Sequence, residues 1–473
     1  MTIWKPDLGS RSGPRYLAIA DALQADIEEG RLKAGARLPT HRQLADALEV
    51  TVGTVTRAYA EAEKRGLTKG EVGRGTFVRP SPESLPVGSF GTLRDEDDAK
   101  GTADGPFELS LSVPHLPSCP EEGRALHEAF SALASDGQLS RLLESQPYAG
   151  AASHRRAGSR WFEEIGVPCE PSQVLICCGA QHAISVVLSS LCRPGDRILC
   201  EQLVYPGLRA AASLLGLRLR GVAVDREGLV PEALEEACGE DDFRVLYCTP
   251  TMQNPTGGIL SEGRRRRIAE IVQSRSLMLI EDEVFHFLPD SPPRPISSRV
   301  PENSCLLLST SKLVAPGLRV GFLRAPQQEV GAMASAIWAT AWMAPPPMAE
   351  LISRWIVKDE LSLFAGWKRR QAQDRNRLAQ QVLGDWLPQG TSPGMHLWLP
   401  LPEPWRAEQF AGQALARGVR VSSSEVFVAG RAAAPHAVRL SLCAESSRER
   451  MEEALQILRR LLQEGPQAAP GVI

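Results

Sequence analysis

The sequence predicts a multidomain α/β protein in which a small helical unit precedes a larger sheet. Residues 1–79 combine helical periodicity with a glycine-rich, β-favouring stretch, which indicates a few helices and a hairpin. Residues 170–325 alternate short apolar runs with helical segments, as a mostly parallel sheet flanked by helices does. Periodicity is lost between them, over 80–106, so we expect a linker there.

Length and composition indicate a globular protein. The chain has 473 residues, of which 43% are apolar and 23% charged. No uninterrupted apolar run reaches about 18 residues, and no charged leader precedes an apolar block, so neither a membrane span nor a secretory signal is expected. The ten cysteines and eight histidines are dispersed, and no metal site or disulfide framework is predicted.

The first eighty residues are predicted to form three helices and a β-wing. A helical stripe covers 16–29, Thr40 is a plausible N-cap for a second helix, and a third runs over 51–65. Glycines among β-favouring residues over 67–78 suit a two-stranded wing. This order is a winged helix-turn-helix, and a three-helix bundle without DNA contacts is the alternative. The third helix is expected to turn four residues inward: Val52, Val55, Tyr59 and Ala62.

The motifs of 14–79 resemble the GntR winged-helix family. They are Gly35-Ala36-Arg37-Leu38-Pro39-Thr40, Thr51-Val52-Gly53-Thr54-Val55 and Gly73-Arg74-Gly75-Thr76-Phe77-Val78. Ten basic and five acidic residues over 31–79 leave a local charge of +5, which suits phosphate contact. In that family the third helix enters the major groove and the wing approaches the minor groove. The resemblance implies DNA contacts for Arg42, Thr51, Thr54, Thr56, Arg57 and Arg74.

One departure affects DNA reading. Val52 stands where many family members have an arginine, so a guanidinium-to-guanine contact is missing and Val52 is free to meet a thymine methyl.

The linker over 80–106 is interrupted by prolines and glycines and carries the acidic cluster Asp95-Glu96-Asp97-Asp98. This composition favours a flexible tether, with a packed interdomain segment as the alternative.

Polar residues follow the predicted strands of the large unit. Asn254 lies in the turn Asn254-Pro255-Thr256-Gly257, and Asp282 and Lys312 each follow a strongly apolar run. A buried carboxylate needs a partner such as a pyridinium N–H, and a desolvated lysine is a competent amine nucleophile. The predicted strands are 174–177, 197–201, 218–222, 244–248, 277–281, 305–309 and 320–323.

Other residues of the same region suit a phosphate and an aromatic ring. Gly179, Ala180 and Gln181 open a helix after the first of these strands, where backbone N–H groups bind anions. Ser309 and Arg319 add a hydroxyl and a guanidinium, and Tyr205 is able to stack on a ring. Together these residues meet the needs of pyridoxal 5′-phosphate, PLP.

Over roughly 107–465 the chain resembles the fold-type I PLP-dependent transferases of the aspartate aminotransferase superfamily. The resemblance implies a large part over about 140–325 and a small C-terminal α+β part over about 365–465, which together form one PLP-binding domain over 107–473. Lys312 would form the internal aldimine as the catalytic residue, Asp282 would pair with the pyridine nitrogen, and Asn254 would contact the ring hydroxyl oxygen. Tyr205 would stack on the ring. The phosphate would be held by Gly179, Ala180, Gln181, Ser309 and Arg319.

The resemblance also implies a homodimer and a carboxylate clamp. Tyr148 matches the tyrosine that reaches a neighbouring subunit's phosphate, and Arg439 matches the arginine that binds a substrate α-carboxylate. Two departures put turnover in question. Phe285 replaces a tyrosine that donates to the ring hydroxyl oxygen, and the signature after Tyr148 is degraded. We therefore expect cofactor capture with slow or residual transamination.

A GntR-type winged helix joined to an aminotransferase-like body is the architecture of the MocR subfamily of regulators. The resemblance implies a cytoplasmic, PLP-dependent transcription regulator, nucleoid-associated when bound to a double-stranded DNA operator. We expect an amine or amino-acid effector to displace Lys312 and form an external aldimine. The alternatives are an active aminotransferase with an accessory DNA-binding domain and a constitutive DNA-binding protein whose large domain is only a dimerisation scaffold.

Overall fold

The computed structural model describes residues 4–6, 14–28, 31–33, 35–71, 75–79, 105–111, 118–137, 139–388, 393–430 and 432–466. Arg74 of the predicted wing and residues 80–104 of the predicted linker lie outside these ranges.

The N-terminal unit has the predicted order of three helices and a hairpin. Thr40 caps the second helix with a reciprocal capping box, because its Oγ1 accepts from the Gln43 N–H while the Gln43 side chain accepts from the Thr40 N–H. Thr51 caps the third helix by accepting from the Thr54 N–H. The elements are α1 (Arg15–Glu28), α2 (His41–Leu48), α3 (Val52–Lys64), β1 (Thr68–Glu71) and β2 (Gly75–Val78), with β1 and β2 antiparallel.

The buried face of α3 differs from the prediction at one residue. Val55, Tyr59 and Ala62 are buried in the core of this unit, as expected. The expectation that Val52 points inward is wrong, because its side chain is 44% exposed. Val52 is the first residue of α3, so it lies beyond the core at the exposed start of the helix.

A mostly parallel sheet forms the centre of the large unit. Each strand lies within one residue of its predicted bounds, and β10 is antiparallel to both of its neighbours. The other pairings are parallel. Among the described residues the sheet has seven strands in this order: β4 (Val174–Cys177), β10 (Gly321–Arg324), β9 (Ser304–Ser309), β8 (Met278–Asp282), β7 (Val245–Cys248), β5 (Arg197–Glu201) and β6 (Arg218–Val222).

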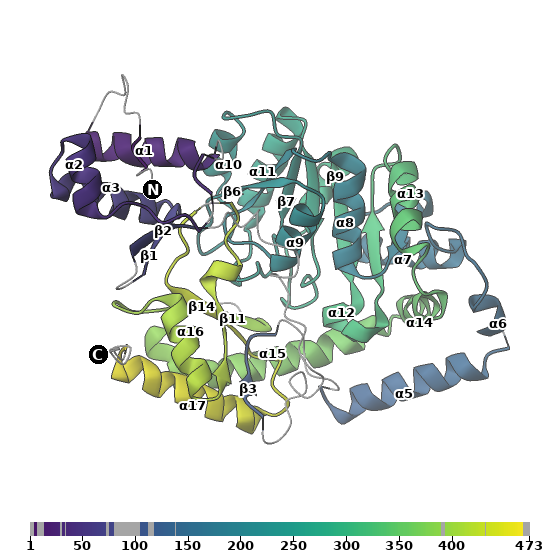
Figure 1. Cartoon of the computed structure of the whole chain (residues 1–473). Coiled ribbons are helices and arrows are strands. Elements are labelled where there is room, and N and C mark those ends of the chain that lie inside the picture. The colour runs from purple at the N-terminus through teal and green to yellow at the C-terminus, as the bar shows by residue number, and fades with distance from the viewer. Residues whose placement is uncertain are drawn as a thin grey trace.

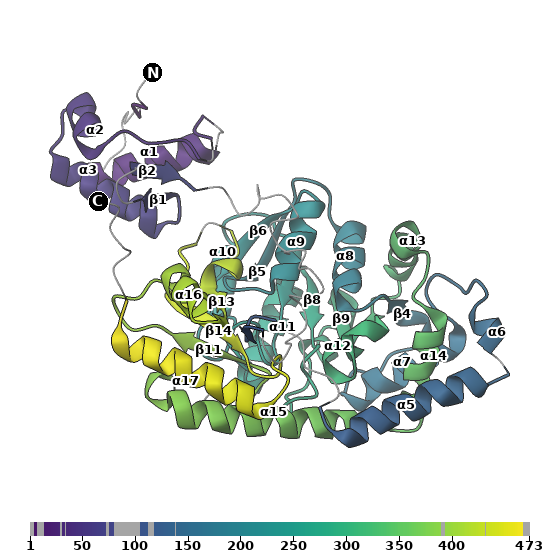
Figure 2. The same ribbon diagram turned by 60° about the horizontal axis from the view of Figure 1, so that its bottom comes forward.

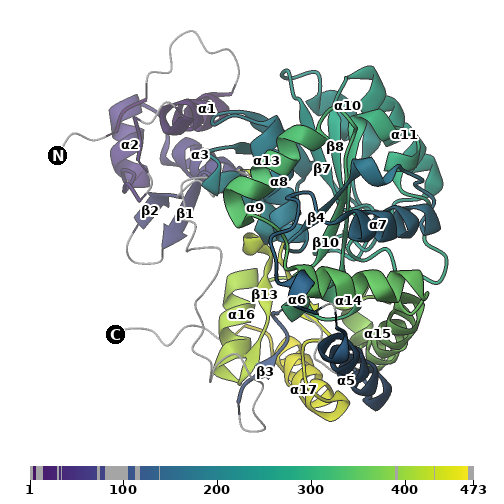
Figure 3. The ribbon, with the colours of Figure 1, turned by 90° about the vertical axis from the view of Figure 1, so that its right-hand side faces the viewer.

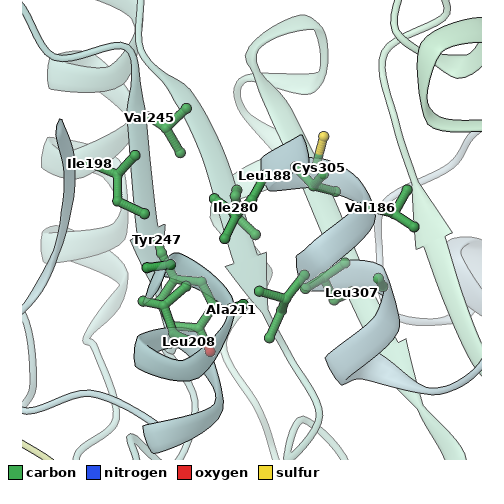
Figure 4. Close-up of a cluster of buried hydrophobic side chains, with 14 of the residues drawn as sticks. Val186, Leu188, Ile198, Leu208, Ala211, Val245, Tyr247, Ile280, Cys305 and Leu307 are labelled. Atoms are coloured by element: carbon green, nitrogen blue, oxygen red, sulfur yellow. The ribbon is translucent and has the colours of Figure 1, made fainter. Parts of the chain in front are cut away.

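Helices cover both faces of this sheet, because alternate strand residues point to opposite sides. Ile280 packs toward α8 (Ala180–Leu191), α9 (Pro206–Leu214) and α13 (Val330–Ala341), whereas Leu279 packs toward α10 (Pro231–Ala237) and α11 (Glu262–Ser274). Figure 4 shows the first of these cores, where side chains of α8 and α9 meet those of the strands. The face beside β4 and β10 is covered by α7 (Ala152–Glu164) and α14 (Pro346–Val357), with α5 (Pro120–Ser135), α6 (Leu139–Leu142) and α12 (Thr310–Leu313) nearby.

The small C-terminal part contains a strand from much earlier in the chain. In the part of the chain that the structure describes, β11 (His396–Pro400), β14 (Ala437–Ser441) and β13 (Ser422–Ser423) form an antiparallel sheet. Beside it, β3 (Phe107–Glu108) pairs in parallel with β12 (Val419–Arg420). Figure 2 shows α15 (Leu361–Leu383) and α17 (Arg448–Glu464) side by side, and α16 (Ala407–Ala416) completes this part.

The N-terminal unit lies to one side of the large unit (Figures 1 and 3). Lys69 Nζ of β1 is 2.9 Å from Glu408 Oε2 of α16, and both side chains are half exposed. Such a pair contributes about 0–1 kcal/mol, so this contact holds the unit only weakly. Within the described ranges, no helix is both long and apolar enough to span a bilayer.

Gly158 tests how tightly α7 packs on the sheet. A Cβ at Gly158 would lie 2.6 Å from Phe322 Cδ1 and 2.8 Å from Val174 Cγ1. We therefore expect Gly158→Ala to lower the free energy of unfolding of the large unit by about 1–3 kcal/mol, despite the helix propensity of alanine. Gly263→Ala in α11, where no atom lies within 4 Å of the added Cβ, is the matched control and is expected to be neutral or stabilising. Urea unfolding of the full chain measures both, and equal midpoints would contradict the prediction.

Candidate functional site

A helix start and an arginine form one end of a cavity at the edge of the large sheet. Gly179 precedes α8 with a φ of 82°, and a Cβ there would lie 2.9 Å from Arg319 Nη2, so glycine is required on both grounds. Arg319 Nη2 donates to the Cys178 carbonyl at 2.8 Å, which fixes the guanidinium beside the helix start. Ala180, Gln181 and Arg319 all line the cavity. The N–H groups of the helix start and the guanidinium make this end suited to a phosphate.

Lys312 enters the cavity from the short helix α12. Ser309 ends β9 and caps α12 by accepting from the Ser311 N–H at 3.3 Å, which sets the direction of the helix. Burial, together with the charges of Arg439 and Arg319, lowers the pKa of Lys312 from its usual 10.5 to about 8, and Asp282 opposes the shift. A substantial fraction of the amine is therefore neutral near physiological pH.

Asp282 is a buried carboxylate at the end of β8. It is 4% exposed, and burial raises its pKa to about 6. The Tyr247 hydroxyl donates to Asp282 Oδ2 at 2.6 Å and the Val284 N–H to Oδ1 at 3.3 Å, and both bonds favour the charged form. The carboxylate is thus held ready to accept from a cationic N–H in the cavity.

Asn254 is placed by a hydrogen-bonded turn. Gln253 organises the turn, because its Oε1 accepts from the Thr256 N–H and hydroxyl at 2.9 and 2.7 Å and its Nε2 donates to the Leu203 carbonyl. Arg439 Nη1 donates to Asn254 Oδ1 at 3.0 Å. Since arginine is only a donor, this contact assigns the oxygen of the amide and leaves its NH₂ group to donate to a ligand oxygen.

These residues enclose a cavity of about 180 Å³. Most of the predicted cofactor residues line it, and so do several that the sequence did not single out. Phe285 is buried at the position predicted to lack a hydroxyl, with its ring centroid 5.5 Å from that of His396. The lining residues are Ala180, Gln181, Tyr205, Thr249, Asn254, Asp282, Val284, Phe285, Ser309, Ser311, Lys312, Pro316 and Arg319.

Arg439 lies behind Asn254 rather than in the cavity lining. Its side chain is 4% exposed, and burial lowers its pKa to about 10, so it stays charged at neutral pH. Besides Asn254 it contacts the Ser110 carbonyl, to which Nη2 donates at 2.6 Å. The role of Arg439 as a carboxylate clamp stays a prediction.

Tyr148 lies apart from the other predicted cofactor residues. It is 41% exposed and packs against Trp338 and Trp342, with ring centroids 6.0 and 5.9 Å away. It does not line the cavity of its own chain. The predicted contact with a neighbouring subunit's phosphate stays a prediction.

Tyr247 supports the site from outside the cavity lining, and sequence reasoning missed it. Its ring belongs to the core between the sheet and α8, and only its hydroxyl reaches Asp282. In the sequence it reads as one more apolar residue of a buried strand. The useful signal is the pairing of β7 with β8, which places Tyr247 opposite Ile280, two residues before Asp282.

The residues predicted to meet DNA are mostly accessible. Arg42, Thr51, Thr56 and Arg57 are exposed and Thr54 is half-buried. Some of these side chains already have local partners. The Thr51 and Thr54 hydroxyls lie 2.9 Å apart at the start of α3, and the Arg57 guanidinium lies 4.3 Å from the centroid of the Tyr16 ring. Their roles in DNA binding stay predictions, and Arg74 lies outside the described residues.

Both parts of the chain match known families. Residues 15–78 match the gntR family of bacterial regulatory proteins, and residues 118–458 match aminotransferase class I and II. The chain is 32% identical to the uncharacterized HTH-type transcriptional regulator YdeF of Bacillus subtilis, over 97% of this chain and 96% of that protein. The chain belongs to the MocR subfamily of GntR-type regulators.

Other relatives of this MocR-type chain include a regulator and an enzyme. The HTH-type pyridoxine biosynthesis transcriptional regulator PdxR of Corynebacterium glutamicum is 26% identical, over 78% of each chain. The structure of LysN, the α-aminoadipate aminotransferase of Thermus thermophilus, complexed with N-(5′-phosphopyridoxyl)-L-leucine, superposes with a TM-score of 0.68 at 26% identity. It covers 81% of this chain and 98% of that one. The protein is a transcription regulator with an aminotransferase-like, PLP-binding domain.

The cavity fits PLP. The α8 start, Ser309 and Arg319 suit the phosphate, Asp282 suits the pyridine nitrogen, and Lys312 suits the aldehyde carbon. When bound, PLP supplies an electrophilic aldehyde that condenses with primary amines. The protein's own residues would hold the phosphate, keep Asp282 charged and present a neutral Lys312 amine.

We expect Tyr247→Phe to weaken PLP binding by about 10- to 100-fold at pH 6.5, the value of one hydrogen bond to a charged group. The hydrogen bond from the Tyr247 hydroxyl lowers the pKa of Asp282. Without this bond the pKa of Asp282 rises above about 6, and a smaller fraction of Asp282 is charged at pH 6.5. At pH 8.5 both proteins keep the charged form, and the difference should shrink. Tyr59→Phe, which also loses a buried hydroxyl bond, to the Pro39 carbonyl in the N-terminal unit, should not change PLP affinity. Absorbance titrations measure the affinities, and a loss that does not depend on pH would contradict the role given to Asp282.

The rate of PLP capture should rise with pH around a midpoint of about 8, the pKa to which burial lowers Lys312. Only the neutral amine attacks the aldehyde, so protonation below this pKa slows capture. Stopped-flow absorbance on the PLP-free protein from pH 6 to 10 measures the midpoint. A midpoint near 10.5, the ordinary value for lysine, would show that the amine is not desolvated.

Proposed function

We propose that the protein senses an amine or amino acid by exchange with Lys312 on PLP and changes its DNA binding in response. One observation carries the proposal. A single chain joins a winged helix-turn-helix to a cavity in which Lys312, Asp282 and an anion-binding helix start converge. The effector acts through the difference between its affinities for the two arrangements of the protein, since a ligand with equal affinity for both shifts nothing.

Selection of the effector follows from the groups around Lys312. A primary amine is required to take the place of the lysine, and Arg439, adjacent to Asn254, supports an effector with a carboxylate. Phe285 lines the cavity where related enzymes supply a hydroxyl, which favours binding over turnover.

A homodimer is part of the proposal. Tyr148, Trp338 and Trp342 form an aromatic patch in which each side chain is at least 41% exposed, and exposed apolar patches mark interaction surfaces. A second copy over this patch would carry Tyr148 toward the partner's phosphate. We divide the chain into a DNA-binding domain over 1–79, a linker over 80–106 and a PLP-binding domain over 107–473. A homodimer would then have two winged helices, and the distance between them would set its affinity for paired half-sites. DNA contacts are assigned to Arg42, Thr51, Thr54, Thr56, Arg57 and Arg74.

Transaminase activity is the second candidate, because Lys312 and Asp282 line the same cavity and both have pKa values moved toward neutrality. Sustained keto-acid production from an amino donor, with many turnovers per site, would favour the enzyme. A single turnover or none would favour sensing.

Footprinting on DNA upstream of the protein's own gene, with and without PLP, tests the regulator. We expect two spaced protected half-sites whose pattern changes with PLP in the native protein but not in Lys312→Ala. Arg42→Ala should weaken binding uniformly and reduce the salt slope by about 1. Arg226→Ala, an exposed arginine of the large unit, is the matched control. Absence of protection in every condition would contradict the proposal, as would an unchanged chromophore in Lys312→Ala.

A further inference from the structure

Arg439 is a buried cation whose hydrogen-bond partners, in the described part of the chain, are neutral oxygens. Nη1 donates to Asn254 Oδ1 at 3.0 Å, and Nη2 donates to the Ser110 carbonyl at 2.6 Å and more weakly to Ser422 Oγ at 3.4 Å. Nε is buried without an acceptor. A buried guanidinium in this state has unused capacity for an anion.

A hydrogen-bonded turn holds the Ser110 carbonyl at Arg439. Glu108 Oε1 accepts from the Ser110 N–H at 2.7 Å and from the Leu111 N–H at 3.1 Å, which folds the backbone so that the carbonyl faces Arg439. Ser422 Oγ donates to the same carbonyl at 3.0 Å. The carbonyl therefore accepts from at least two donors, one of which is the guanidinium.

A carboxylate that binds a guanidinium at two points uses Nη2 together with either Nε or Nη1. Both edges of the Arg439 fork thus include the nitrogen that now donates to Ser110. Nη2 has two hydrogens, and the Ser110 carbonyl and, more weakly, Ser422 Oγ already accept them. A carboxylate that uses Nη2 must therefore displace one of these oxygens, and its negative charge lets it compete with the neutral carbonyl.

The segment with this carbonyl is also where the chain coming from the winged helix-turn-helix reaches the small C-terminal part. Residues 80–104 lie outside the described ranges, and 105–111 follow them. There β3 pairs with β12, the Leu109 N–H donates to the Arg420 carbonyl at 3.0 Å, and the Ser441 N–H donates to the Leu109 carbonyl at 2.7 Å. Ser441 ends β14, the strand that contains Arg439.

We propose that the Ser110 carbonyl occupies the carboxylate subsite of the effector and that an effector carboxylate displaces it from Arg439. The displacement loosens the turn at Ser110 and Leu111, in the segment that attaches the DNA-binding unit. This inference rests on the proposed function, because it takes Arg439 as the group that meets the effector.

Two ligands that differ by one carboxylate test the displacement. N-(5′-phosphopyridoxyl)-L-leucine and N-(5′-phosphopyridoxyl)-3-methylbutylamine are titrated into the full-length, PLP-free protein, and the ratio of their Kd values measures the preference for the carboxylate. Ser422→Ala removes one hydrogen bond to the Ser110 carbonyl and should raise this preference by about two- to ten-fold. Ser423→Ala is the matched control, since its side chain points to the other face of the same strand, and it should leave the preference unchanged.

Hydrogen exchange of the native protein gives a second readout. The leucine conjugate should speed exchange of the Ser110 and Leu111 amides relative to the methylbutylamine conjugate, because only the former has the displacing group. Equal exchange, or a preference that Ser422→Ala leaves unchanged, would overturn the displacement.

Arg439→Gln separates this inference from the function on which it rests. If Arg439→Gln abolishes the preference while Ser422→Ala has no effect, Arg439 binds the carboxylate and the Ser110 carbonyl does not compete. If the native protein binds both conjugates equally, the inference is overturned while PLP binding stands. If neither conjugate binds, the proposed function fails and this inference fails with it.

Discussion

The burial of opposite charges at the ends of adjacent strands is the constraint on which the large unit depends. Asp282 and Lys312 are both enclosed, and burial moves the pKa of each toward neutrality, to about 6 and about 8. Such groups are costly to keep in a folded chain unless hydrogen bonds compensate them. Tyr247 and the Val284 N–H do so for Asp282. The same low-dielectric setting makes Lys312 a nucleophile, so the destabilising burial and the chemistry have one origin.

Much of this arrangement could be predicted from the sequence, because it depends on local patterns. Apolar runs gave each strand of the large sheet to within one residue, and residues just after those runs met at one edge because parallel strands end together. Thr40 and Thr51 marked the starts of α2 and α3 through their capping chemistry. Gly179 and Arg319 are far apart in the chain, but a side chain at position 179 would clash with the Arg319 guanidinium at one end of the cavity.

What could not be predicted depends on contacts between distant segments. Tyr247 has no sequence signal of its role, because its function comes from one hydroxyl that crosses to the next strand. Val52 fits the apolar stripe of α3, but a periodic pattern does not show where a core ends. The partners of Arg439 come from the turn at Asn254 and from Ser110, 329 residues earlier in the chain, at a distance that no periodicity covers.

The pairing of β3 with β12 bears on where the chain can be divided. The match to aminotransferase class I and II begins at residue 118, yet Phe107, Glu108 and Leu109 complete the small C-terminal part. A fragment that starts at 118 would leave the β12 edge and the Ser441 N–H without their backbone partners, and would uncover the buried Leu109 site in the core. The aminotransferase-like body is thus longer than its family likeness, because its first strand, β3, lies on the N-terminal side of that match.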